Sequence, residues 1–318
     1  MQALRSVRTR RSYKRAIAAE ELERAKWNLS TILENAEVAE CNRSPLCDDT
    51  GIPHVFVEVG PNKCVTGALL TAIQDGVREG LRQLPGRPMA ILGDDEGRID
   101  MSGGISPNSD DLDAAPILIK EVEEDVLRVH VLMLGGGPAI RGITHRIFHK
   151  HDVKVVLDEI VTRAKDATKL LGCTPSALAI GVGRSQFEAT ALMMEAMVYS
   201  DFNKQSRMEQ YITDQVNETN VGPLGLNGKT TVLATFMKVG PQRASGVRVV
   251  AMRPGCRSRY SVSWGFSMAL PPRMGPRKSS RHRRASRTTS SGNSLFASSY
   301  RVLAKTSVKF FSIRFPFR

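Results

Sequence analysis

The spacing of apolar residues along the chain predicts alternating helices and strands. Apolar residues recur at three- and four-residue steps, which is typical of helices with one buried face, over residues 17–39, 65–84, 153–171, 186–197 and 206–219. Short apolar runs predict strands at residues 54–59, 115–120, 126–134, 177–182, 230–239 and 246–252. The two kinds of element alternate without repeats. The expected class is therefore mixed α/β, with helices packed around mixed sheets.

One long segment interrupts this pattern. Residues 86–116 are rich in Gly, Asp, Ser and Pro and hold few large apolar side chains, so they predict a long loop. Long loops inside compact domains are often functional.

The chain has 318 residues, of which 41% are hydrophobic, and this can supply a core. No stretch approaches the roughly 18 consecutive apolar residues of a membrane helix, and no apolar segment follows the arginine-rich start. We therefore expect a soluble cytoplasmic protein with no membrane partner.

The net charge of +13 is concentrated at the C-terminal end. Residues 257–318 hold 14 basic and no acidic residues, whereas residues 1–256 hold 31 basic and 32 acidic residues, a net charge of −1. We therefore expect a folded domain over 1–256 and an irregular, basic, Ser/Arg-rich tail over 257–318, either disordered or produced by a shifted reading frame. Translation of the other two frames tests the frameshift. If the tail is genuine, it favours an alternative function, nucleic-acid binding, because uncompensated positive charge attracts phosphates.

The five cysteines are odd in number and widely spread, so they do not form a disulfide framework. Cys47, Cys173 and Cys256 lie at turn-like positions where regular elements end. Thiolates are the usual ligands of iron–sulfur clusters, and three of them leave one iron open to a substrate oxygen. Spacing alone favours buried, inert thiols, because no Cys-x-x-Cys pair is present.

Other candidate residues accompany these cysteines. Asp48 and Asp49, beside Cys47, could pass a proton to or from a metal-bound hydroxyl, or could simply cap a turn. Gly135, Gly136 and Gly137 offer bare backbone amides that could approach a carboxylate, or could only need positive φ angles.

Two further motifs each have a functional and a purely structural interpretation. Residues 222–231 resemble a phosphate-binding loop ending in Lys229, but Pro223 stands where the first glycine is required, so a plain turn is as well supported as an anion-contacting loop. The nearby His145, His149 and His151 favour a solvated basic face over a metal site, because no carboxylate lies between them.

These segments resemble the cluster-binding half of class I fumarases and L-tartrate dehydratases, which is often a separate alpha subunit. Residues 45–51, Pro-Leu-Cys-Asp-Asp-Thr-Gly, are similar to the family's Pro-x-Cys-Gln-Asp-Thr-Gly. Residues 222–231 match its Gly-x-Gln-Gly-Leu-Gly-Gly-Lys-Thr-Thr run, and residues 173–183 and 249–256 match its second and third cysteine segments. The resemblance covers residues 20–256.

The resemblance implies a 4Fe-4S cluster held by Cys47, Cys173 and Cys256, with Asp49 as the acid that protonates the departing hydroxide. It implies a small dicarboxylate substrate, such as malate, fumarate or tartrate, contacted by residues that include Asp48, Gly135, Gly136, Gly137 and Lys229. The catalytic base and several anchors lie in the family's partner half, with a Thr-Ala-Arg-Asp motif that this sequence lacks. A beta subunit, in an alpha2beta2 assembly, is therefore implied as necessary for activity. An electron carrier is disfavoured, because such clusters normally have four protein ligands.

Departures from the family pattern concern the substrate more than the cluster. Asp48 replaces the usual Gln and adds a negative charge. Residues 134–140 keep the glycines of Lys-Gly-Gly-Gly-Ser-Glu-Asn but lose its polar groups, and residues 242–245 lack the histidine of the common Thr-His-Ala-Ser.

Overall fold

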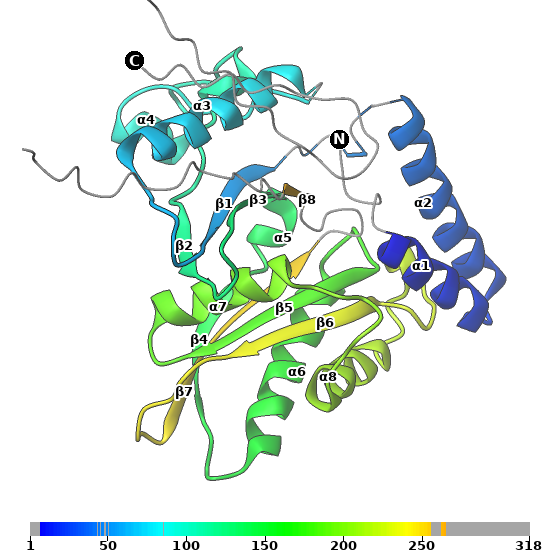
Figure 1. Cartoon of the computed structure of the whole chain (residues 1–318). Coiled ribbons are helices and arrows are strands. Elements are labelled where there is room, and N and C mark those ends of the chain that lie inside the picture. The colour runs from blue at the N-terminus through cyan, green and yellow to red at the C-terminus, as the bar shows by residue number, and fades with distance from the viewer. Residues whose placement is uncertain are drawn as a thin grey trace, which may run out of the picture.

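The computed structural model describes residues 7–42, 44, 46, 47, 49, 51–84, 86–255 and 262–264. Two four-stranded sheets with helices packed around them confirm the mixed α/β class (Figure 1). The helical segments are α1 (Val7–Ala19), α2 (Glu23–Asn42), α3 (Gly67–Gln83), α4 (Asp95–Asp100), η1 (Ser109–Asp111), α5 (Gly136–Ala139), α6 (Val153–Lys169), α7 (Gln186–Val198), α8 (Arg207–Asn217) and η2 (Pro223–Gly225). The strands are β1 (Ile52–Val59), β2 (Leu118–Glu121), β3 (Leu127–Leu134), β4 (Ile143–Phe148), β5 (Ser176–Gly183), β6 (Val232–Val239), β7 (Val247–Gly255) and β8 (Val262–Trp264).

The first sheet has the strand order β2-β1-β3-β8, with β1 parallel to β2 and antiparallel to β3. Ile52 pairs with Leu134, so the residues that precede β1 lie beside those that follow β3. Strand β8, which is part of the predicted tail, pairs with β3. The predicted division at residue 256 stays a prediction.

The second sheet has the order β4-β7-β5-β6, with β7 antiparallel to both β4 and β5. Gly255 pairs with Ala177, so the end of β7 lies beside the start of β5. Every residue of β5 is buried, because helices cover both faces of this strand.

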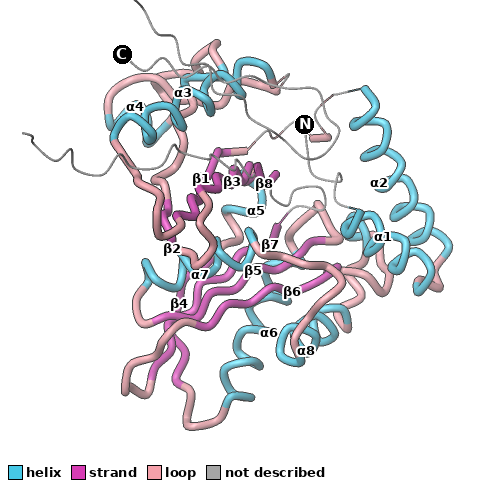
Figure 2. The backbone as a smooth tube through the Cα atoms, in the orientation of Figure 1, coloured by secondary structure: helices cyan, strands magenta, loops and turns pink. Residues whose placement is uncertain are grey.

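The elements form successive layers (Figure 2). Helix α3 packs on one face of the first sheet through Leu69, Ile73 and Val77. Helix α7 packs between the two sheets, with its methionines against side chains from both, and α6 and α8 cover the far face of the second sheet. The helix pair α1–α2 stands at one side and joins the second sheet through Leu233.

A buried polar cluster also ties the first sheet to α7. The Glu58 side chain, on β1, is 1% exposed and accepts hydrogen bonds from Arg128, from Nε2 of His130 at 3.1 Å, and from the hydroxyl of Tyr199 at the end of α7. Burial alone would raise the pKa of Glu58, but these donors outweigh it and hold that pKa below its usual value. The hydrogen bonds to the buried Glu58 carboxylate therefore come from two layers of the fold, the first sheet and α7.

The predicted single helix over residues 17–39 is wrong, because the structure has two helices with a break at Glu20. The Glu20 carboxylate is 3% exposed. It accepts the backbone N–H groups of Glu21 and Leu22 at 3.1 and 3.3 Å, and that of Lys229 at 2.8 Å. Glu20 thus accepts backbone N–H groups that have no partner within the helix where α2 begins, and it connects the break to the loop that holds Lys229. Local periodicity does not report such a contact between distant residues.

The prediction that the three histidines lie on a solvated basic face is wrong for His145. This residue lies in β4, a strand missing from the sequence prediction, and neither ring nitrogen has a hydrogen-bond partner among the described residues. Burial lowers the pKa of His145, and the charge of Arg163 lowers it further. His149 instead joins two loops, since its Nε2 contacts the Ser245 carbonyl at 2.9 Å and its Nδ1 accepts the backbone N–H of His151.

In the part of the chain described here, no helix combines the length and apolarity that crossing a bilayer requires.

Candidate active site

The candidate site lies where the two sheets meet, at the ends of β1, β3, β5 and β7. Strand pairing brings Asp49, just before β1, beside the glycines that follow β3. It also brings Gly255, at the end of β7, beside the start of β5, three residues after Cys173. Arg253, near the end of β7, connects these two places, because its Nη2 donates to the carbonyl of Gly135 after β3 at 2.7 Å.

Asp49 is held by the glycine run. The backbone N–H of Gly136 donates to Oδ2 of Asp49 at 2.7 Å. A Cβ at position 135 would lie 2.7 Å from the same oxygen, so the carboxylate lies directly against bare backbone. Of the three glycines, Gly135 and Gly136 lie against the chain's own Asp49, and Gly136 donates to it. Contact between Gly135, Gly136 or Gly137 and a substrate stays a prediction.

The Cys173 segment is clamped to the loop at residues 222–231. Oγ1 of Thr174 donates to the Gly222 carbonyl at 2.6 Å and accepts the Gly225 N–H at 3.1 Å. The Leu224 N–H donates to the Thr174 carbonyl at 3.0 Å. Gly222 has a φ of 69°, and a Cβ there would lie 2.1 Å from the backbone of Asn227. Glycine is therefore required for this tight turn.

The Cys47 segment reaches the same loop. Leu46 and Leu224 both pack against the apolar cluster that contains Leu29 of α2. Because the Leu224 N–H is hydrogen-bonded to the Thr174 carbonyl, the neighbours of Cys47 and of Cys173 border one apolar cluster. Both thiols are partly exposed. Cys41, on α2, and Cys64, in the loop after β1, are exposed.

The donor set suits an iron–sulfur cluster better than a hard cation, because thiolates are soft ligands. No three His, Cys, Asp or Glu side chains form a metal site within the described residues. Cys256 follows Gly255 directly, but Cys256 and Asp48 lie outside those residues. The set of three cysteine ligands therefore stays a prediction. The described residues next to each of these cysteines lie at one edge of the fold.

Lys229 contacts acidic residues at the break between α1 and α2. Its backbone N–H donates to Glu20, and its ammonium group forms an ion pair with Glu21. The hydrogen bond and charge of Lys229 lower the pKa of the exposed Glu21. The role of Lys229 in substrate binding stays a prediction, and it requires the ammonium to leave Glu21.

Sequence reasoning missed Arg253 and His54. Arg253 is 9% exposed and is the one buried lysine or arginine among the described residues. Burial lowers the pKa of His54 and the charge of Arg253 lowers it further, which outweighs the contact of its Nδ1 with the Ile52 carbonyl at 3.0 Å. The sequence did contain a signal for Arg253: it lies within an apolar strand, three residues before Cys256, a candidate ligand. Charged residues are seldom buried without a partner, so this position indicated a specific contact.

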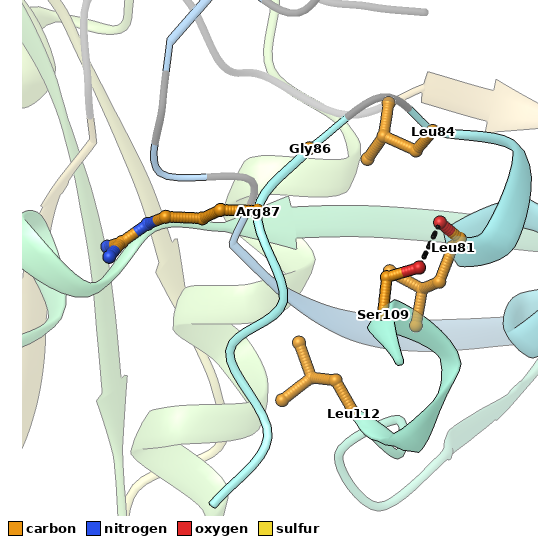
Figure 3. A pocket seen from close by; sticks show the side chains of 6 residues that line it. All are labelled: Leu81, Leu84, Gly86, Arg87, Ser109 and Leu112. Carbon is orange, nitrogen blue, oxygen red and sulfur yellow. Dashed lines mark hydrogen bonds between the residues drawn. The ribbon is translucent and has the colours of Figure 1, made fainter. Parts of the chain in front are cut away.

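Two cavities have linings that contain none of the predicted site residues. The first, between α3 and the long loop, is too narrow for water. Its wall includes Leu81, whose carbonyl accepts a 2.9 Å hydrogen bond from Ser109, and Arg87 points away from it (Figure 3). The second, of about 480 Å³, lies between α1 and α8. Amide side chains that line this cavity form hydrogen bonds within the protein. For example, Oε1 of Gln205 accepts hydrogen bonds from the Thr213 hydroxyl and the Thr235 N–H, both at 2.7 Å.

Comparison with known proteins gives one family. A family model described as fumarate hydratase (fumerase) matches residues 3–262. A putative L(+)-tartrate dehydratase subunit alpha from Methanocaldococcus jannaschii is 22% identical over 231 residues, which cover 70% of this chain and 79% of that protein. The L(+)-tartrate dehydratase subunit alpha of Escherichia coli K12 is 25% identical over 235 residues, covering 71% of this chain and 74% of that one.

A longer relative is also similar. A putative fumarate hydratase class I from Geobacillus stearothermophilus is 26% identical over 233 residues, which cover 68% of this chain but 43% of that protein. The chain therefore corresponds to less than half of this relative. These descriptions give no support to nucleic-acid binding, and the basic tail on which that alternative rests lies almost wholly outside the described residues.

Proposed function

The chain belongs to the fumarate hydratase family of hydro-lyases, and from this premise we propose that it is the cluster-carrying subunit of an enzyme that hydrates or dehydrates a C4 dicarboxylate. The reaction is either the interconversion of fumarate and malate or the conversion of tartrate to oxaloacetate. The observation that carries the proposal is the meeting of Asp49, the Cys173 segment and the end of β7 at one edge of two sheets.

The proposed cofactor is a 4Fe-4S cluster held by Cys47, Cys173 and Cys256. When bound through three thiolates, it supplies one open iron that acts as a Lewis acid on the substrate hydroxyl and carboxylate. Two features support the donor set: thiols at the ends of regular elements, and a carboxylate two residues from Cys47. The proposed location is the cytoplasm, where thiols stay reduced.

Asp49 is proposed as the general acid. The Gly136 N–H occupies Oδ2, so Oδ1 is the oxygen assigned to carry the proton to the departing hydroxide. The hydrogen bond fixes the carboxyl orientation, which a proton transfer within hydrogen-bond reach requires. Asp48, Gly135, Gly136, Gly137 and Lys229 are proposed to contact the dicarboxylate.

A beta subunit is proposed to complete the site, in an alpha2beta2 assembly. Two relatives are named as alpha subunits, and the longer relative extends well beyond the region that matches this chain. Three exposed apolar side chains, Ile140, Leu170 and Leu226, lie on the loops that form the site. Exposed apolar residues next to a polar site are consistent with a surface that a partner covers.

The test is anaerobic co-expression with a beta partner from the same source, followed by cluster reconstitution. Iron is measured per chain, and turnover is measured with malate, fumarate and tartrate. We expect Cys47→Ser, Cys173→Ser and Cys256→Ser each to lose the cluster, because serine lacks the soft thiolate. Cys41→Ser, on the exposed face of α2, is the matched control and should retain full iron.

Two results would contradict the proposal. Full iron binding in any of the three site variants would remove that cysteine from the ligand set. Absence of turnover with all three diacids, in a protein with a complete cluster and a bound partner, would reject the dicarboxylate reaction.

A further inference from the structure

Arg253 is an unusual residue for the place it occupies. It is the one lysine or arginine buried among the described residues, and it lies in a strand that is otherwise largely apolar. Burial of a guanidinium without compensation is strongly unfavourable, so its hydrogen-bond partners are expected to matter. One partner is the Gly135 carbonyl, at 2.7 Å from Nη2.

The Gly135 carbonyl and the Gly136 N–H belong to the same peptide group. Arg253 holds the oxygen end of this group, and the Asp49 carboxylate accepts from its nitrogen end at 2.7 Å. A cation and an anion therefore face opposite ends of one amide dipole. Both hydrogen bonds are charge-assisted, and each polarises the amide in the sense that strengthens the other.

The packing around this peptide explains the glycine. Gly135 has φ −66° and ψ 154°, a conformation that any residue adopts, so backbone freedom does not require glycine here. A Cβ, however, would lie 2.7 Å from Oδ2 and 3.3 Å from Cγ of Asp49. Glycine is present because Asp49 must approach the backbone this closely.

We propose that Arg253 is a positioning residue for Asp49, acting through the peptide that joins Gly135 to Gly136. The strand that leads to Cys256 would thereby also set the orientation of the proposed general acid. This inference rests on the proposed function for its catalytic consequence, but the structural relay can be measured without activity.

The first measurement is amide exchange of Gly136 in the full-length protein without its cluster. In Arg253→Met, we expect the Gly136 N–H to exchange about tenfold faster, because the bond to Asp49 loses its polarising partner. Arg253→Lys keeps a cationic donor and should stay within about threefold of the natural protein. Arg248→Met is the matched control, because Arg248 lies on the same strand and, among the described residues, its guanidinium donates hydrogen bonds to the nearby Ser245 and Val247 carbonyls and not to Gly135.

The second measurement is turnover of the loaded complex, expressed per cluster. Arg253→Met should lower kcat about a hundredfold with KM within about threefold, because a misplaced acid slows the reaction without weakening substrate binding. Arg253→Lys should recover most of this loss. In an Asp49→Asn background, Arg253→Met should have little further effect, since the residue through which it acts is already lost.

Unchanged Gly136 exchange in folded Arg253→Met would overturn the inference, as would an undiminished effect of Arg253→Met in Asp49→Asn. If Arg253→Met does not fold, Arg253→Gln, which keeps a polar but uncharged side chain, replaces it with the same two outcomes. If the natural complex turns over no diacid, the proposed function fails, and the exchange measurement alone decides the inference.

Discussion

Substitution of Gly135 by alanine tests the close approach of Asp49 to the backbone. The added Cβ would lie 2.7 Å from Oδ2, where an ordinary carbon–oxygen contact needs about 3.4 Å. The backbone angles at this position suit alanine, so the chain itself need not distort. The carboxylate must therefore retreat by about 0.7 Å, and its 2.7 Å bond to Gly136 lengthens to about 3.4 Å, past the usual range of about 2.7–3.2 Å.

The expected cost follows from the loss of that bond. A charge-assisted hydrogen bond contributes about 1.5–3 kcal/mol, and a misplacement of about 1 Å at a reacting group lowers the rate about a hundredfold. We expect Gly135→Ala to lower kcat by about that factor while iron per chain stays complete. The assay is anaerobic turnover of malate by the reconstituted complex, with urea unfolding as a measure of stability.

Gly80→Ala is the matched control, because it makes the same chemical change inside α3 where nothing lies within 4 Å of the new Cβ. It should leave kcat unchanged and stabilise the helix by about 0.5–1 kcal/mol. Normal kcat in Gly135→Ala would refute the reasoning, because Asp49 would then tolerate displacement or have no role in proton transfer.

Three further predictions concern packing, pH and the proposed substrate contact. Gly181→Ala should reduce the free energy of unfolding by about 3 kcal/mol in urea, because its Cβ would lie 1.9 Å from the Ala189 carbonyl in α7; stability within 0.5 kcal/mol of the natural protein would contradict this. Glu58→Gln should destabilise by about 3 kcal/mol at pH 7. Folding lowers the pKa of Glu58, so the stabilisation from its charge is present at pH values above the pKa of the unfolded state and is lost as pH falls through the pKa of the folded state. The urea unfolding curves of the two proteins should therefore converge in acid. A difference in unfolding free energy that does not change with pH would show that the charge is not responsible. Lys229→Ala should raise KM for the diacid at least tenfold with normal iron content, whereas Glu21→Gln should not; an unchanged KM would leave Lys229 with only its ion pair.

The class of fold and most of its elements follow from the local pattern of apolar residues, because periodicity reports which face of a segment is buried. The helices over α3, α6, α7 and α8 and the strands β1, β3, β5, β6 and β7 fall where the apolar pattern places them, within a few residues. Local motifs around Cys47, Cys173 and residues 222–231 likewise pointed to one family, which the match over residues 3–262 confirms.

The remaining features depend on contacts between residues that are far apart in the chain, so the local pattern could not predict them. The break at Glu20 is anchored to Lys229, more than two hundred positions away, and no window of sequence contains both. Strand β4 was missed because its burial comes from pairing with β7 and from α6 above it, which a short run with charged residues does not reveal. The role of Arg253 could not be predicted for the same reason: its partner, the Gly135 carbonyl at 2.7 Å, follows β3 of the other sheet and lies 118 positions earlier in the chain.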